Sequence, residues 1–164
     1  MRKFVLCLIF TLLFCSPAYA ITYHGIPMYC RTQIEFGVKE SVMKQIIEDM
    51  NEEGYELIQK TGIVLLFEAP LRKSNRFNYA TDFGNNWFPL NKYGWKRSEF
   101  SSPVYQLDVT VVKKTKNSVE VEITPLIIWN PGNAYQENIY EYYKKTLDAL
   151  NEYLESLKEN FENN

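Results

Sequence analysis

The chain is poor in the residues on which most nucleophilic enzymes and metal sites depend. Among its 164 residues there is one histidine, His24, and there are three cysteines, Cys7, Cys15 and Cys30. A serine or cysteine nucleophile needs a positioned base, and no G-x-S-x-G sequence accompanies the lone histidine. The sequence therefore offers no residue that we can single out as catalytic.

An excess of positive charge is also missing. The formal net charge is -2 with histidine neutral. The first twenty residues carry Arg2 and Lys3 and no acid, so the chain without them has a net charge of -4. No overall basic field supports nucleic-acid binding.

The longest apolar run, Phe4–Phe14, is too short to span a bilayer comfortably. It follows two basic residues and precedes the small-x-small sequence Ala18-Tyr19-Ala20, which is the plan of a secretory signal peptide. We expect residues 1–20 to be removed, leaving 21–164 as a single periplasmic or secreted domain. A retained membrane anchor is the alternative, whereas lipidation at Cys15 is disfavoured because Phe14 precedes it.

The loss of Cys7 and Cys15 with the leader leaves one cysteine, so the mature chain cannot form an internal disulfide. Residues 28–35 alternate in polarity, and a period of two is typical of a half-buried strand. Met28, Cys30 and Ile34 fall on its apolar side. We therefore expect Cys30 to be a buried, unreactive thiol.

An amphipathic helix should follow this strand. Apolar residues recur there at three- and four-residue spacing: Val38, Val42, Met43, Ile46, Ile47 and Met50. Gly54 is well placed as its left-handed C-terminal residue. The sequence YELIQKTGIVLLFEA then predicts two short strands with a break at Gly62.

Residues 104–127 give the clearest hairpin, with two alternating segments joined by the polar loop KKTKNS. After it we expect a long helix with Asn133 as N-cap and Gln136 at the capping-box position. Its apolar seam would comprise Ile139, Tyr143, Leu147, Leu150, Leu154, Leu157 and Phe161. That seam fits a helix lying on a sheet, which favours a monomer; a dimeric coiled coil is the alternative.

This order predicts an α+β fold of two layers, with an antiparallel sheet covered on one face by an N-terminal helix and a long C-terminal helix. The hairpin YQLDVTVV…VEVEITPLIIW followed by NAYQENIYEYYKKTLDALNEYL resembles, in layout, the helix-grip domains of bacterial envelope proteins, of the BamC-like kind. The resemblance covers most of residues 28–161 and includes no diagnostic motif, and the chain lacks the lipidated cysteine. It implies a binding or scaffold role.

Two candidate sites have plain structural explanations. His24, Met28 and Cys30 are ligand types that suit Cu(I) or zinc, but they supply three ligands at most. We expect Met28 and Cys30 in the core and His24 in an exposed, mobile arm, with no metal and no cofactor. Many carboxylates are present, but Asp108, Glu120 and Glu122 fall on the polar side of the hairpin, as expected for a solvated sheet face.

The most informative segment is 71–103, which has a net charge of +4 within an acidic protein and interleaves basic with aromatic residues. Aromatic rings can stack on sugars or clamp apolar chains, and guanidinium and ammonium groups bind anions. We expect residues 72–97 to form the binding surface. The predicted contacts are Trp87 and Trp95 as stacking residues and Arg72, Arg76, Lys96 and Arg97 as anion-binding residues. Two additional strands whose aromatics complete the core are the structural alternative.

The sequence thus favours an exported, non-enzymatic binding or scaffold module of the cell envelope over an enzyme. The partner would be a glycan, a lipid head group or an acidic protein, and not a nucleic acid. After processing the chain would not span the membrane. The runner-up is a hydrolase acting on envelope polymers, which should show a cleft with two titratable groups within hydrogen-bond reach.

Overall fold

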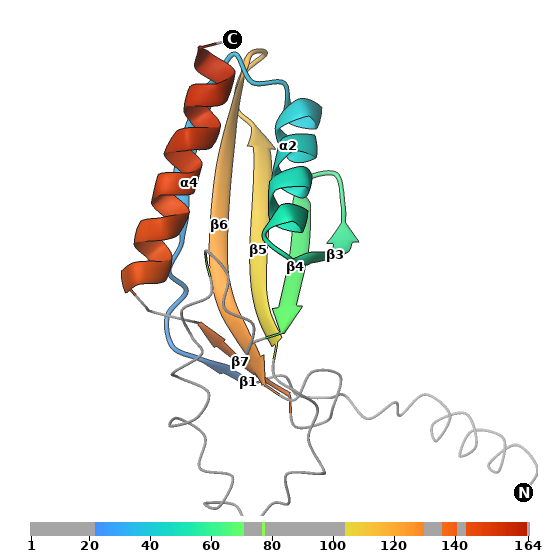
Figure 1. Ribbon diagram of the computed structural model, residues 1–164, viewed down its shortest axis with the longest axis vertical. Coiled ribbons are helices and arrows are strands. Elements are labelled where there is room, and N and C mark those ends of the chain that lie inside the picture. Colours follow the sequence, from blue (N-terminus) through green and yellow to red (C-terminus); the bar gives the residue numbers. More distant parts are fainter. Residues whose placement is uncertain (1–21, 71–76, 78–103, 130–135, 141–143, 164) are drawn as a thin grey trace, which may run out of the picture.

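The structure is a computed structural model, and it describes residues 22–70, 77, 104–129, 136–140 and 144–163. This part of the chain contains seven strands and two helices (Figure 1). In order they are β1 (Thr22–His24), β2 (Cys30–Glu35), α2 (Lys39–Glu52), β3 (Glu56–Lys60), β4 (Val64–Pro70), β5 (Val104–Lys113), β6 (Ser118–Trp129), β7 (Glu137–Tyr140) and α4 (Lys144–Glu162).

The strands form one sheet in the order β1-β7-β6-β5-β4-β3, with β2 also paired to β6. Every pair is antiparallel except β1 and β7, which run parallel. Strand β6 is long enough to take two partners along one edge. Its first half, from Ser118 to Ile123, pairs with β2, and its second half, from Leu126 to Trp129, pairs with β7.

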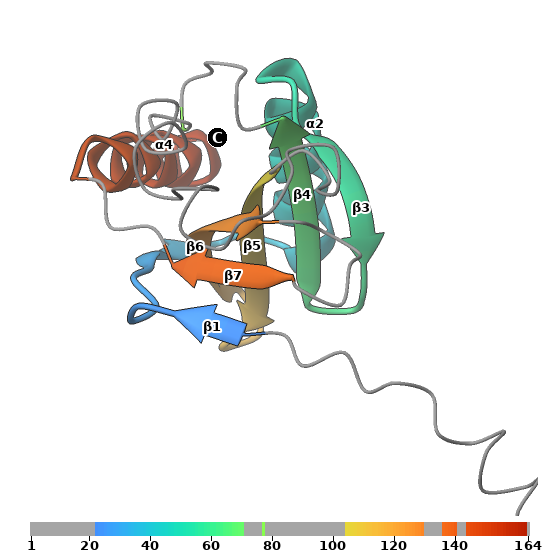
Figure 2. The same cartoon turned by 90° about the horizontal axis from the view of Figure 1, so that it is seen from below.

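Both helices lie on the same face of the sheet, which makes the domain two-layered (Figure 2). Helix α4 packs mainly over β2, and α2 packs over β3 and β5. The alternation in β2 fits this arrangement, because Cys30, Thr32 and Ile34 are buried while the residues between them are exposed. We call the face opposite the helices the outer face.

The core between the two layers is apolar and rich in aromatic rings. Its largest fully buried side chains are those of Tyr105, Phe67, Phe77, Ile34, Ile46, Met50, Leu65, Leu107, Ile123, Leu150, Leu154 and Leu157. Aromatic rings join the elements, since Tyr55 contacts Tyr105 at a centroid distance of 6.4 Å. Part of the aromatic content of the sequence is therefore explained by packing.

The turn from β2 into α2 has a steric constraint at Gly37 and a left-handed backbone at Phe36. Gly37 is enclosed, because a Cβ atom there would lie 3.1–3.2 Å from methyl groups of Ile34, Val119 and Val42. Phe36, not the glycine, takes the left-handed backbone conformation, with φ of 62°. This conformation is uncommon and costly for a bulky residue.

The α+β class and the helix after β2 are confirmed. The strand predicted within 28–35 is found at Cys30–Glu35, and the hairpin predicted over 104–127 is found with its second strand extended to Trp129. Gly54 has the predicted positive φ, at 85°. Val38 was wrongly assigned to the apolar stripe of the helix, because it precedes the first helical residue and is 60% exposed. The prediction that His24 lies in a mobile arm was also wrong, since its backbone belongs to β1.

The predicted start of the long helix was wrong as well. The helix α4 begins at Lys144, and residues 137–140, which we had placed inside it, form strand β7. Pairing on both sides explains the difference, because β7 bonds to β6 and β1 simultaneously. The sequence ENIY carries a β-branched and an aromatic residue, so tertiary pairing overrides its place in the helical repeat. Asn133 lies outside the described residues.

The part of the predicted seam that lies in α4 packs against the core, and Tyr143 lies outside the described residues. Leu150, Leu154 and Leu157 are buried, and Leu147 and Phe161 are partly buried against the same cluster. The exposed leucine seam that a helix-mediated dimer would need is therefore not present on α4. Within the described ranges, neither helix is long and apolar enough to cross a bilayer.

Leu150 provides a test of this packing. Leu150→Ala should lower the free energy of unfolding by about 2–5 kcal/mol, because the side chain is fully buried between α4 and the sheet. The measurement is urea denaturation followed by circular dichroism. Glu152→Ala, an exposed position on the same helix, is the control and should change stability by less than about 0.5 kcal/mol. Equal stabilities for the two variants would contradict the packing described here.

Candidate functional site

The predicted binding residues, Arg72, Arg76, Trp87, Trp95, Lys96 and Arg97, lie outside the described residues. One residue of the surrounding segment 71–103 is described, Phe77, and it is 1% exposed. Its ring meets that of Tyr153 edge-on at 5.5 Å and that of Tyr55 at 6.3 Å. Of the two alternatives for the aromatics of this segment, core completion therefore applies to Phe77.

The residues on either side of the segment 71–103 are held in the sheet. β4 and β5 pair from Val64↔Thr110 to Pro70↔Val104, so the residues on either side of the segment are hydrogen-bonded neighbours. A hairpin needs only two to five residues to turn at such a point. The sheet therefore does not require the segment 71–103 for its own closure.

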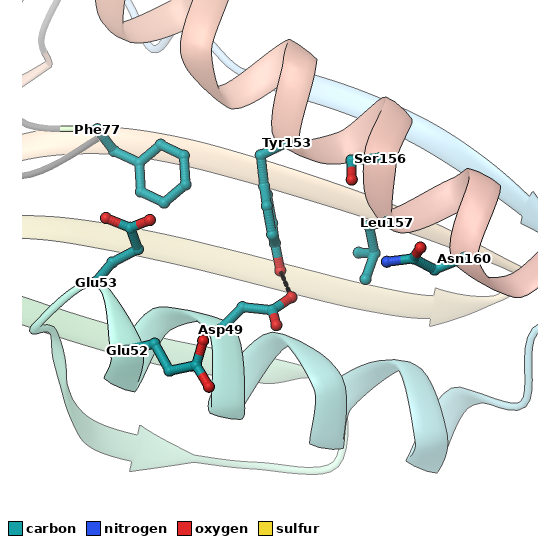
Figure 3. A pocket seen from close by; sticks show the side chains of 8 residues that line it. All are labelled: Asp49, Glu52, Glu53, Phe77, Tyr153, Ser156, Leu157 and Asn160. Atoms are coloured by element: carbon teal, nitrogen blue, oxygen red, sulfur yellow. Dashed lines mark hydrogen bonds between the residues drawn. The ribbon is translucent and has the colours of Figure 1, made fainter.

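Phe77 also lines an open cavity of about 170 Å³ between α2 and α4 (Figure 3). The last turn of α2 contributes carboxylates, and α4 contributes a phenol, a hydroxyl, an amide and a leucine. The lining residues are Asp49, Glu52, Glu53, Phe77, Tyr153, Ser156, Leu157 and Asn160. We call this cavity the interhelical pocket.

The best-defined interaction in the interhelical pocket joins the two helices. The Tyr153 hydroxyl donates a hydrogen bond to Oδ2 of Asp49 at 2.9 Å. The other oxygen, Oδ1, accepts from the Gln45 amide at 2.7 Å. Asp49 is thus held in one orientation, with a phenol beside it and two further acidic residues on the same helix turn. Such a pocket can bind a cationic or hydroxyl-rich group, and it also fixes α2 against α4.

Sequence reasoning missed this pocket, although a signal was present. Acidic side chains at a helix C-terminus lie beside the negative end of the helix dipole, where cations are favoured. Helix α2 ends with Asp49, Glu52 and Glu53 and has no basic residue in its last turn. Such a cluster of negative charge suggests that another element donates hydrogen bonds to it, and here Tyr153 of α4 donates to Asp49.

The outer face of the sheet carries a second group of charges, as predicted for the polar side of the hairpin. Arg31 donates from Nε and Nη2 to one carboxylate oxygen of Glu122, at 3.1 and 2.5 Å. Lys114 lies 2.9 Å from a carboxylate oxygen of Glu120. These pairs are partly exposed and contribute little to stability.

Two carboxyl groups on the outer face, those of Asp108 and Glu68, are partly buried, which disfavours their charged forms. Burial raises the pKa of Asp108, and the charge of Glu122 raises it further. Burial likewise raises the pKa of Glu68, which faces Glu56 directly across the β3–β4 pair. Oδ1 of Asp108 is buried and accepts no hydrogen bond from the described residues. These groups destabilise the fold when they are ionised.

The structure does not bring His24, Met28 and Cys30 together as a site. His24 is in β1 opposite Ile139, whereas Cys30 is in β2 opposite Ile123. The Cys30 thiol points to α4, where it donates to the carbonyl of Leu147 at 3.4 Å. In the part of the chain that the structure describes, no three His, Cys, Asp or Glu side chains are grouped to hold a metal ion.

Comparisons of the chain with protein-family models, with curated proteins and with solved structures found no match.

Cys30 should label slowly in the native protein. Burial, with a contribution from the charge of Asp148, raises the pKa of its thiol to about 11. The reactive thiolate should be about a hundredfold scarcer than for an ordinary cysteine, because each pKa unit is a factor of ten. Maleimide labelling followed by mass spectrometry, with and without urea, measures this. Labelling at the same rate in both conditions would show that the thiol is accessible.

Asp108 should contribute less stability at neutral pH than in acid below the ordinary aspartate pKa. Its folded-state pKa is raised, so the folded form takes up a proton more readily than the unfolded chain as the pH falls. Stability from this group is therefore greatest below the ordinary aspartate pKa and is lost as the pH rises through the raised value.

Asp108→Asn, compared with wild type in urea melts across this pH range, should be more stable at pH 7 and should lose the advantage in acid. An Asp108→Asn variant that is less stable than wild type at pH 7 would contradict this electrostatic account.

Proposed function

We propose that the chain is an exported binding module of the cell envelope and that its basic-aromatic segment 72–97 contacts an anionic partner. The partner class is a glycan, a lipid head group or an acidic protein. Export is supported by the leader-like sequence of residues 1–20. The observation that carries the proposal is the place of the segment in the fold.

The segment leaves β4 at Pro70 and returns to β5 at Val104, and these two residues are paired in the sheet. Long connections in compact domains are most often functional, and a rigid scaffold that holds both ends lowers the entropy lost on binding. Phe77 adds a third fixed point, because it is buried against Tyr153 on α4. Basic and aromatic residues on a connection that the sheet itself does not need favour recognition as their role.

A hydrolase is the second candidate, and one observation favours it. The interhelical pocket contains two titratable groups within hydrogen-bond reach, Asp49 and Tyr153, with Glu52 and Glu53 on its rim. Incubating the protein with peptidoglycan and measuring soluble fragments tests this candidate. Release that disappears in Asp49→Asn would favour the hydrolase, and equal release by both proteins would exclude this pocket as the site.

The test of the binding proposal compares wild type with Trp87→Ala/Arg97→Ala, using Lys145→Ala on α4 as a control for the loss of a basic side chain. Each mature protein is mixed with purified peptidoglycan, with anionic vesicles and with envelope protein extract, and the retained fraction is measured at two salt concentrations. Wild type and Lys145→Ala should retain one of these components, less strongly at high salt. The double variant should lose it.

Urea melts of the same proteins separate binding from folding. Arg97→Ala alone should shift stability by less than about 0.5 kcal/mol, as surface substitutions usually do. The proposal is wrong if the double variant folds and retains the component as well as wild type. It is also wrong if Arg97→Ala unfolds the protein, because the segment would then be core architecture.

A further inference from the structure

Three apolar side chains are exposed on two connections at one end of the sheet. Phe36 is 72% exposed and Val38 is 60% exposed, and both lie on the connection from β2 to α2. Ile63, in the turn from β3 to β4, is 49% exposed. The two connections are joined, because Nζ of Lys39 donates to the carbonyl of Gly62 at 2.5 Å. We call Phe36, Val38 and Ile63 the apolar tip.

A lysine-rich turn lies beside the apolar tip. The turn between β5 and β6 carries Lys113, Lys114 and Lys116, which are all exposed. Glu35, just before Phe36, pairs with Ser118 at the end of that turn. In Figure 1 the connection after β2 passes next to the β5–β6 turn at the top, as this pairing requires. Ile63 is nearby too, because its carbonyl accepts from the amide of Val111 at 2.8 Å.

Acidic residues border this end, and two of them accept hydrogen bonds within the fold. The Glu35 carboxylate accepts from the amide of Gln33 at 2.6 Å, and the Glu162 carboxylate accepts from the backbone N–H of Glu35 at 3.1 Å. Glu40 is exposed in the first turn of α2. These neutral donors leave both carboxylates charged, and Lys114 lies 2.9 Å from a carboxylate oxygen of Glu120. The positive charge available in the lysine turn therefore comes from Lys113 and Lys116, which are exposed.

Phe36 combines a left-handed backbone, with φ of 62°, with a side chain that is 72% exposed. A left-handed backbone disfavours a bulky residue, and strain of this kind is most often found at functional positions. Gly37 cannot exchange roles with it, because Gly37 is enclosed by methyl groups of Ile34, Val42 and Val119. The turn consequently holds an aromatic ring out in solvent.

We propose that the apolar tip and the lysine turn together seat this end of the protein on an anionic phospholipid surface. Shallow insertion of a few apolar side chains, with lysines at the head-group level, needs no shape complementarity. A stable protein interface needs about 800 Å² of well-packed surface on each partner, which three separated side chains on two turns do not supply. The charge and the small apolar area both favour a membrane surface.

The two ends of the β4–β5 pair would then have different roles. The apolar tip lies near the start of β4, and the segment 71–103 leaves from its far end at Pro70. A protein seated by the apolar tip would keep that other end away from the lipid surface. This inference does not rest on the binding role proposed for residues 72–97, and the two are separable by experiment.

The test is co-sedimentation of the mature protein with vesicles of phosphatidylcholine, with and without phosphatidylglycerol. Phe36→Gly removes the ring and relieves the backbone strain, so it should bind about tenfold more weakly or worse while its urea midpoint stays equal or rises. Ile26→Ala, which changes an exposed apolar residue elsewhere, is its control and should bind as wild type.

Lys113→Gln/Lys116→Gln tests the charge contribution. It should weaken binding to the anionic vesicles alone, and more so at low salt. Lys144→Gln/Lys145→Gln, at the start of α4, is the matched control. Vesicle binding that Trp87→Ala/Arg97→Ala keeps and Phe36→Gly loses would assign the lipid contact to the apolar tip and leave peptidoglycan or an envelope protein as the partner of the segment 72–97.

The proposal is overturned if wild type does not sediment with either kind of vesicle, or if Phe36→Gly binds as well as wild type. Loss of binding in Trp87→Ala/Arg97→Ala but not in Phe36→Gly would assign lipid contact to the segment instead. Concentration-dependent association of wild type that Phe36→Gly abolishes, without vesicle binding, would assign the apolar tip to a protein interface.

Discussion

The pairing of β6 along both of its edges is the constraint on which the rest of the fold depends. β5 covers one edge over almost the whole strand, while β2 and β7 share the other. The β2 half brings Cys30 and Ile34 beneath α4 and sets the turn that exposes Phe36. The β7 half withdraws residues 137–140 from helix formation and fixes where α4 begins. Both ends of the domain therefore depend on one strand.

Most of the elements could be predicted from the sequence, because local periodicity and burial agree in them. Residues 30–35 alternate between buried and exposed, and the parts of the hairpin next to the lysine turn, 107–112 and 119–124, alternate between buried and partly exposed. The start of α4 could not be predicted, because Ile139 fits both the helical seam and a strand. Only the partners β1 and β6 decide between these, and they are distant in sequence. Val38 was misassigned because an apolar residue just before a helix looks like part of its stripe.

The candidate sites, too, could be predicted from the sequence only in part. The basic-aromatic composition of 72–97 is visible in the sequence, and its attachment at Pro70, Phe77 and Val104 is visible in the structure. The interhelical pocket arises from Asp49 and Tyr153, which meet through tertiary packing, and no spacing rule links them. The apolar tip depends on backbone geometry at Phe36 and on the enclosure of Gly37, neither of which a residue pattern encodes.

Amide hydrogen exchange along β6 tests the central role of that strand most directly. Since β6 is paired at both edges, the account predicts slow exchange through both halves, 118–123 and 126–129, with the second half protected as well as the first. Slow exchange in the first half together with rapid exchange at those amides of 126–129 that point toward β7 would contradict it. That result would mean that β7 is not paired and that residues 137–140 belong with the helix.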